Sequence, residues 1–244
     1  MEFKKLLPFI LIVLGLAAVV VAFVVIKNKN KDDTSEEDLS ALIDVALVDR
    51  PVAKLIPSED GHWLKLVVDK LVVSEAASMD YELLYKLPDG RTQGVPGTIK
   101  LSGSKLIERD LLLGSESSGK FRYDEGVESG TLTLRYRNEK GKLIAKFVTE
   151  FALVNGVKDV ASKDGGFSVT LGKATDSYLV AMETFGIPEE APGEVVAGPY
   201  GLFSSSKADL AGEVKMNGQI YRYSGSAWED SFSEATGIFV GISK

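Results

Sequence analysis

The chain has 244 residues, a formal net charge of −7 and no cysteine. The absence of cysteine excludes thiolate nucleophiles, cysteine-based zinc sites and disulfide bonds. Residues 1–31 contain five lysines and one glutamate, so they carry +4 and the rest of the chain carries −11. Because such an acidic body repels polyphosphate, we do not expect nucleic acid as a partner.

The first predicted element is a membrane-spanning helix over residues 6–26. This run, LLPFILIVLGLAAVVVAFVVI, has 21 residues and no charged side chain. A helix of that length crosses a hydrocarbon core of roughly 30 Å, in which backbone polar groups must be satisfied internally. A cleaved signal peptide is the alternative, but the apolar core is long and lacks an A-x-A-like site. We expect residues 1–31 to be an uncleaved signal anchor that contacts the lipid bilayer through residues 6–26.

The orientation of the anchor rests on its flanking charges. Lys4 and Lys5 precede the apolar run, and Lys27, Lys29 and Lys31 follow it. The rule that places basic residues on the cytoplasmic side is therefore close to a tie. A short N-terminal tail inside and a long exported domain is the common outcome. We expect a single-pass protein of the cell membrane with an extracytoplasmic body.

Residues 32–50 are predicted to be a polar linker with a short amphipathic helix. Apolar residues recur at helical spacing between Leu39 and Leu47, and Thr34 with Glu37 fits a capping box. The helix would end before Pro51. The alternative is a first β-strand over residues 41–48.

From Pro51 the pattern changes to short apolar runs, which predicts a β domain over residues 51–155. The strongest runs are HWLKLVVDKLVV, MDYELLYKL, LIERDLLL, GTLTLRYR and KLIAKFVTEFALV. In TLTLRYR, Leu132, Leu134 and Tyr136 alternate with polar residues, so one face is apolar. Turns are predicted at residues 89–90 and 138–141. Strands at this spacing without long helices predict a mainly β fold, an antiparallel sandwich.

A second β-rich domain is predicted over residues 160–244. Its candidate strands are FSVTLGK, SYLVAMETFG, EVVAGPYGLF, GEVKM, QIYRYS and TGIFVGIS. Asn217 and Gly218 separate GEVKM from QIYRYS, and this dipeptide is the strongest short-range hairpin signal. The alternative is that both halves form one larger sandwich.

Residues 114–121, GSESSGKF, match part of the phosphate-loop pattern. Phe121 stands where a serine or threonine would hold the metal, and the residues after it do not predict a helix. The segment is therefore predicted to be a loop that binds no nucleotide.

Catalytic and metal-binding patterns are not found. His62 is the only histidine, it follows a turn, and no G-x-S-x-G elbow supplies a nucleophile. Neighbouring acids such as Asp124 and Glu125 carry no spacing that separates catalysis from a solvated surface. We expect no catalytic residue, no metal site and no cofactor, and therefore a protein that is not an enzyme.

The candidate binding residues are the aromatic side chains of the second domain. Tyr221 and Tyr223 share one face of a predicted strand, and Tyr200 and Trp228 lie in the same domain. Such side chains form platforms for sugars or protein partners. The alternative is that they fill the core.

Residues 81–101, YELLYKLPDGRTQGVPGTIKL, and 108–137, ERDLLLGSESSGKFRYDEGVESGTLTLRYR, carry a family resemblance. The chain resembles uncharacterised single-anchor bacterial surface proteins with an immunoglobulin- or fibronectin-like β-sandwich domain, over about residues 50–155. The resemblance implies the fold and the anchor but no activity. Members of this group tend to have two cysteines in the loop that matches residues 114–123, where this chain has Glu116 and Phe121.

These patterns predict a membrane-anchored extracytoplasmic β-sandwich protein that binds, adheres or serves structurally at the cell envelope. An envelope protein or glycan is the expected partner. The alternatives are a membrane-tethered subunit of an envelope complex and a carboxylate-based glycan-active enzyme.

Overall fold

The computed structural model describes residues 42–70, 73–103 and 106–243. Residues Ile43–Lys244 form one compact unit. The described residues are mainly β, and all strand pairs between them are antiparallel. The predicted anchor and residues 32–41 of the linker lie outside the described residues. No helix in the described part of the chain is long and apolar enough to cross a membrane.

The helix predicted in the linker is wrong for the part that is described. Residues 42–46 form no regular element, and a single 3₁₀ turn, Leu47–Asp49, follows them. The backbone N–H of Ile43 donates to the carbonyl of Ile144 at 2.8 Å. This donor is therefore bonded to a distant part of the chain and not to a neighbouring residue of a helix. Arg50, which precedes Pro51, is extended with ψ 149°, as the proline requires.

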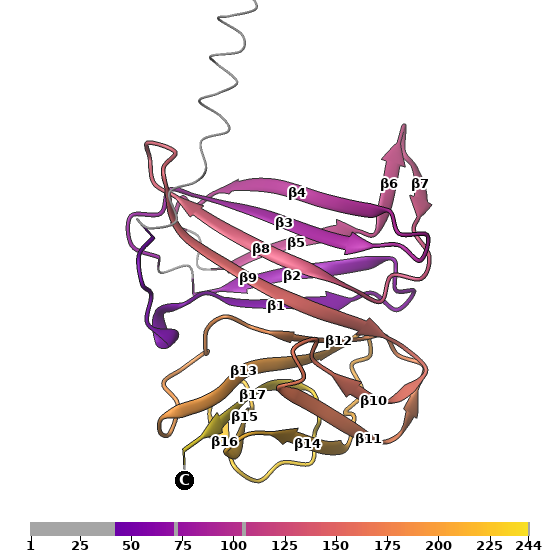
Figure 1. The fold of residues 1–244 in the computed structure, drawn as a ribbon, viewed down its shortest axis with the longest axis vertical. Coiled ribbons are helices and arrows are strands. Elements are labelled where there is room, and N and C mark those ends of the chain that lie inside the picture. The colour runs from indigo at the N-terminus through magenta and orange to yellow at the C-terminus, as the bar shows by residue number, and fades with distance from the viewer. Residues whose placement is uncertain (1–41, 71–72, 104–105, 244) are drawn as a thin grey trace, which may run out of the picture. The chain divides into compact units, whose positions relative to one another are not determined.

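The first half of the body is sandwich-like (Figure 1). One layer has the order β1 (Val52–Pro57), β2 (Trp63–Asp69) and β5 (Leu106–Leu112). The other contains β4 (Thr92–Lys100), β3 (Ser78–Lys86), β8 (Ser129–Arg137) and β9 (Leu143–Val154), in that order. Alternate residues of both layers point inward, and Leu66, Leu83 and Leu134 are fully buried between them.

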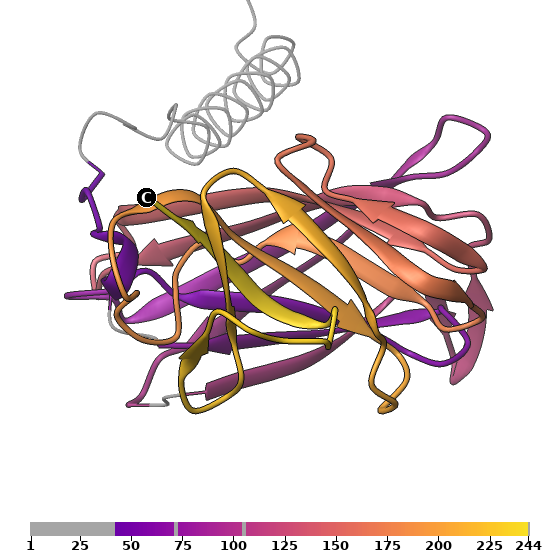
Figure 2. The same ribbon diagram turned by 90° about the horizontal axis from the view of Figure 1, so that it is seen from below.

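The second layer continues into the rest of the chain as a nine-stranded sheet. β9 pairs with β12 (Leu179–Glu183), which is followed in the sheet by β13 (Val195–Ser204), β17 (Gly237–Ile242), β15 (Gln219–Tyr223) and β16 (Trp228–Glu229). A separate sheet of β10 (Val157–Ala161), β11 (Phe167–Thr175) and β14 (Gly212–Met216) encloses a second core with it. Figure 2, seen from below, has these later strands nearest the viewer.

Strand β12 contributes to both cores. Val180 and Met182 pack in the first core, whereas Leu179 and Ala181 pack in the second. Because successive side chains of a strand point to opposite faces, the two three-stranded sheets cover opposite faces of the nine-stranded sheet. The sheet thus runs without interruption through both predicted domains, 51–155 and 160–244. The division of the body into these two domains stays a prediction.

The predicted strand runs coincide with observed strands, but none of them covers β1, β4, β10, β16 or the two short strands between residues 114 and 123. β4 has Pro96 at its centre with Gly94 and Gly97 on either side. These residues disfavour a strand, and β4 is tolerated because it is the edge of the nine-stranded sheet, where a missing N–H costs no ladder bond.

The predicted turns have different outcomes. Residues 89–90 connect β3 to β4, and residues 138–141 connect β8 to β9, as predicted. The hairpin predicted at Asn217 and Gly218 is wrong. β14 pairs with β11, while β15 pairs with β16 and β17, so this turn carries the chain from one sheet to the other.

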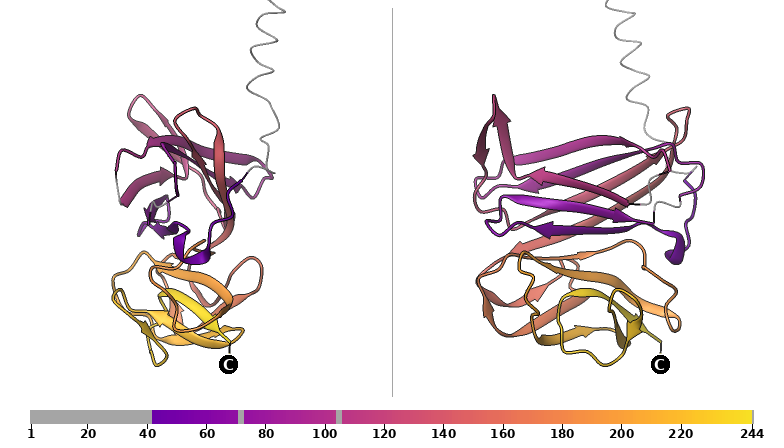
Figure 3. Two further views of the ribbon diagram at one scale, coloured as in Figure 1. Left: turned by 90° about the vertical axis from the view of Figure 1, so that its left-hand side faces the viewer. Right: turned by 180° about the vertical axis from the view of Figure 1, so that it is seen from behind.

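Residues 114–123 form a β-hairpin instead of the predicted loop. β6 (Gly114–Ser117) pairs with β7 (Lys120–Tyr123), and the turn residues Ser118 and Gly119 both have positive φ, 53° and 75°. Positive φ at both central residues fits the right-handed twist of two paired strands. The hairpin projects from one end of the first sandwich (Figures 1 and 3). No helix follows it, so the geometry of a phosphate loop is not formed.

Candidate functional site

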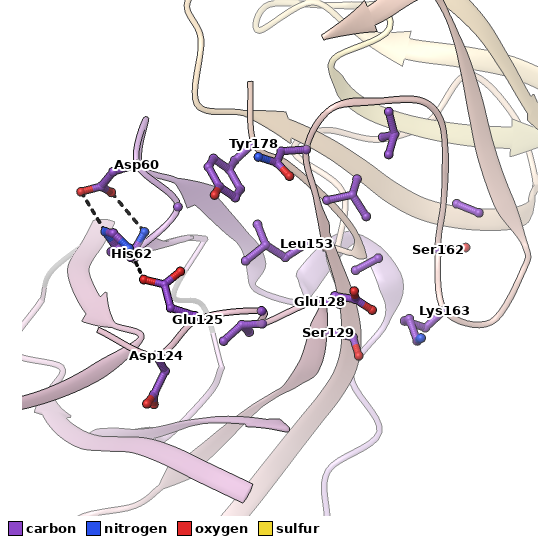
Figure 4. A pocket seen from close by; sticks show the side chains of 18 residues that line it. Asp60, His62, Asp124, Glu125, Glu128, Ser129, Leu153, Ser162, Lys163 and Tyr178 are labelled. Carbon is purple, nitrogen blue, oxygen red and sulfur yellow. Dashed lines mark hydrogen bonds and ion pairs between the residues drawn. The ribbon is translucent and has the colours of Figure 1, made fainter. Parts of the chain in front are cut away.

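A pocket of about 680 Å³ opens beside the base of this hairpin. Five segments line it: the β1–β2 loop, the β7–β8 loop, the end of β9 with the following turn, the β10–β11 turn, and Tyr178 ahead of β12. Figure 4 shows Asp60, His62 and Glu125 on one side and Lys163 on the other. Four acids line the pocket (Asp60, Asp124, Glu125 and Glu128).

The β1–β2 loop presents His62 in a fixed position. Ser58 Oγ donates to Asp60 Oδ1 at 2.5 Å, and the backbone N–H of His62 donates to the same oxygen at 3.1 Å. The hydrogen bond from Ser58 and, to a smaller extent, the one from the His62 backbone lower the pKa of Asp60 below its ordinary value. Trp63, the first residue of β2, donates its backbone N–H to Ser58 Oγ at 3.0 Å. The sequence prediction that His62 ends a loop before a strand is confirmed.

Both nitrogens of the His62 ring face carboxylates. Nδ1 lies 3.3 Å from Asp60 Oδ2, and Nε2 lies 3.5 Å from Glu125 Oε1. The Nδ1 contact does not have hydrogen-bond geometry, so among the described residues this buried atom has a charged neighbour but no hydrogen-bond partner. A nucleophile activated by histidine would need a hydroxyl at this place instead of a second carboxylate.

The aromatic row consists of His62, Trp63, Phe121 and Tyr123. His62 stacks on Tyr123 with ring centroids 4.1 Å apart and planes at 10°. Tyr123 is parallel to Phe121 at 6.2 Å, and Phe121 meets Trp63 edge to face at 5.6 Å. Phe121 is 46% exposed and Tyr123 37%, and they are the only large aromatic side chains of the described residues in the exposed class. The row is therefore both ordered and accessible.

Asp124, the residue after β7, links the hairpin to the first sandwich by two hydrogen bonds. Asp124 donates its backbone N–H to the carbonyl of Leu113 at 2.9 Å and accepts a hydrogen bond from Tyr85 Oη at 2.9 Å. Burial, together with that hydrogen bond to a carboxylate, raises the pKa of Tyr85, so the hydroxyl stays a donor. The base of the aromatic row is therefore held by the core.

The four aromatic residues selected from the sequence do not form one site. Tyr200 is buried in the second core, stacked on Phe167 with centroids 5.5 Å apart, and donates to Asp164 Oδ2 at 2.5 Å. Tyr223 and Trp228 do meet, edge to face at 5.3 Å. Tyr221 shares the face of β15 with Tyr223, and both are partly buried.

Tyr223 and Trp228 hold a surface loop. Tyr223 Oη donates to Glu189 Oε1 at 3.1 Å, and Trp228 Nε1 donates to the carbonyl of Glu189 at 3.3 Å. This loop comprises residues 187–194, and all of it except Ile187 is exposed or partly exposed. The aromatic side chains here have a visible packing role, and a binding role for them stays a prediction.

Sequence reasoning missed Phe121 and Tyr123. The signal that could have located them is the alternation of Phe121 and Tyr123 with Lys120 and Arg122, which is typical of a strand with one apolar face. It was masked by the partial phosphate-loop pattern, which favours a loop.

No protein-family model, curated protein or solved structure matches the chain. Among the described residues no group of three or more histidine or acidic side chains is arranged to hold a metal ion.

Proposed function

We propose that the chain is a membrane-anchored, extracytoplasmic β-sandwich protein that binds a partner of the cell envelope through the aromatic row. The observation that carries this proposal is the exposure of Phe121 and Tyr123 on a hairpin that the core holds in place. Ordered, accessible aromatic side chains are enriched at binding surfaces because they bury a large area at little cost in conformational entropy.

The strand order supports an immunoglobulin-like sandwich for residues 51–155. β1, β2 and β5 correspond to strands A, B and E, and the order β4-β3-β8-β9 corresponds to C′, C, F and G. In this correspondence His62 lies in the A–B loop and the hairpin lies in the E–F connection. Sandwich domains commonly place binding residues on such end loops, which tolerate variation while the sheets stay rigid.

The anchor and the exported location rest on residues 6–26. Since the chain has no cysteine, one introduced cysteine is a unique chemical label. Ser117 is exposed near the hairpin turn and suits this purpose. We expect Ser117→Cys to react with a membrane-impermeant maleimide in intact cells. Labelling that appears only after lysis would place the body on the cytoplasmic side and contradict the proposed location.

Binding is tested by capture with the full chain in detergent micelles. Envelope glycans and cross-linked envelope proteins are offered to the wild-type chain, to Phe121→Ala/Tyr123→Ala and to Leu84→Ala/Val148→Ala. Leu84 and Val148 are also exposed apolar residues but lie outside the row, so they form the matched control. We expect a component that wild type and control retain and the row variant loses.

The retained component separates the remaining alternatives. A single protein would favour the subunit of an envelope complex, and a glycan would favour a sugar-binding module. A glycan that is cut would favour the carboxylate-based enzyme. If all three chains retain the same components equally, binding through the aromatic row is wrong.

A further inference from the structure

Two carboxylates flank the aromatic row. Glu116 is the register partner of Phe121 across the hairpin, so the two side chains share one face. Glu125 lies next to His62, and its side chain is 85% exposed. The basic residues of β7, Lys120 and Arg122, alternate with the aromatic residues and therefore lie on the opposite face. The pocket beside the row adds further acids.

The body of the chain as a whole is also negatively charged. The chain outside residues 1–31 carries −11. A field of this sign attracts cationic partners over about one Debye length and opposes anionic ones. Exposed aromatic faces bordered by carboxylates attract ammonium and guanidinium groups, because the ring quadrupole and the carboxylates act in the same direction.

The spacing of the rings matches an extended chain. The centroids of Phe121 and Tyr123 are 6.2 Å apart. In an extended strand, side chains two residues apart are separated by roughly 6.6 Å and lie on the same side. β6 and β7 pair only with each other among the described strands, so the hairpin also leaves strand edges open to an extended segment.

We propose that the aromatic row docks an extended, basic polypeptide segment with Lys or Arg at alternate positions. Two such side chains lie over Phe121 and Tyr123, and Glu116 and Glu125 neutralise them. This inference rests on the proposed function and specifies its partner. It favours a basic protein segment over a neutral glycan because only the basic segment gains charge–charge attraction from the nearby carboxylates.

The test uses the full chain in detergent micelles and fluorescein-labelled peptides followed by anisotropy. The probe is an octapeptide of alternating Lys and Thr. Its controls are the same peptide with Glu for Lys, a block peptide of four Lys then four Thr, and a neutral N-acetylglucosamine tetramer as competitor. We expect the alternating Lys peptide to bind most tightly and the Glu peptide not to bind.

Variants locate the site. Phe121→Ala and Tyr123→Ala should each weaken binding roughly threefold, and together about tenfold. Glu116→Gln/Glu125→Gln should weaken binding several-fold and reduce its dependence on salt. Glu108→Gln/Glu150→Gln removes the same charge from exposed positions outside the row and should change little.

Failure of this inference and failure of the proposed function would give different results. Equal loss of binding in both Glu-to-Gln pairs, or no loss in the aromatic variants, would mean general attraction by the acidic body and would overturn the inference. Capture of an envelope glycan that depends on Phe121 and Tyr123, without binding of the Lys peptide, would replace the partner with a glycan and leave the row as the site. If envelope capture also does not depend on Phe121 and Tyr123, the proposed function fails as well.

Discussion

Leu179 and Val180 are neighbours in β12 but lie in different hydrophobic cores. Leu179 packs with Phe167 and Leu202 in the second core, and Val180 belongs to the core of the first sandwich. Both side chains are fully buried. A strand with two buried faces couples the packing of the two halves, because neither core is complete without it.

We therefore expect the body to unfold in one transition. Trp63 lies in the first half of the body and Trp228 in the second, so the Trp228→Phe and Trp63→Phe variants each leave one tryptophan, in a different half. In urea, both should give the same midpoint. Leu179→Ala should lower both midpoints together, at a cost of about 2–5 kcal/mol, while Leu84→Ala at an exposed position should not. Two separate midpoints would show that residues 51–155 and 160–244 unfold independently.

Two buried tyrosines differ in what their hydroxyls do. Tyr136 is fully buried, and its hydroxyl has no hydrogen-bond partner among the described residues. Tyr85 donates to Asp124. We expect Tyr136→Phe to leave the free energy of unfolding unchanged or to raise it, because it removes an unpaired polar group. Tyr85→Phe should lower it by about 1 kcal/mol. Chemical denaturation of both variants checks this, and a clear loss of stability in Tyr136→Phe would contradict it.

Glu183 makes stability depend on pH. Its burial, reinforced by the charge of Asp164, raises its pKa above the ordinary value of 4.5. A carboxyl whose pKa is raised by folding binds its proton more tightly in the folded state. Its contribution to stability is therefore full below pH 4.5 and is lost as pH rises through the folded pKa. Glu183→Gln should be more stable than wild type at pH 7 and equal to it near pH 4.

Glu150→Gln is the control for this prediction. Glu150 is an exposed acid of the same sheet, on β9. Thermal unfolding at the two pH values should separate the two variants only at pH 7. An effect of Glu183→Gln that is the same at both pH values would contradict the burial argument.

Gly218 lies in the corner at which the chain passes from β14 in one sheet to β15 in another, and this position requires a glycine. Its φ is 89°, and a Cβ there would lie 2.6 Å from the carbonyl oxygen of Ile242. Gly90 has a similar φ, 86°, but no atom within 4 Å of such a Cβ. Gly90→Ala should therefore cost only the left-handed strain, about 1–2 kcal/mol. Gly218→Ala should cost ~1–3 kcal/mol more, because the added methyl overpacks the corner. Equal denaturation midpoints for the two variants would show that the backbone around Gly218 can shift to accommodate the added methyl group.

The candidate site could be predicted only in part. The position of His62 between a turn and a strand follows from local sequence signals, since Gly61 precedes it and an apolar run follows. The stacking of His62 on Tyr123 does not, because 60 residues separate them and only the pairing of β2 with β5 brings the hairpin next to the loop. The four aromatic residues selected in the second domain were separated by the sheet register, which turned Tyr200 into one core and Tyr223 towards a surface loop.

The sequence by itself determined most of the strands, most of the predicted turns and the mainly β class. These depend on the alternation of apolar and polar residues and on glycine and proline, which act within a few positions along the chain. Tertiary structure decided which strands pair, as the residues Asn217 and Gly218 demonstrate. Their local signal is that of a hairpin, but β14 and β15 gain more by joining the two sheets that enclose the second core than by pairing with each other. Burial of apolar area is a property of the whole fold, and so it overrides the preference of a two-residue turn.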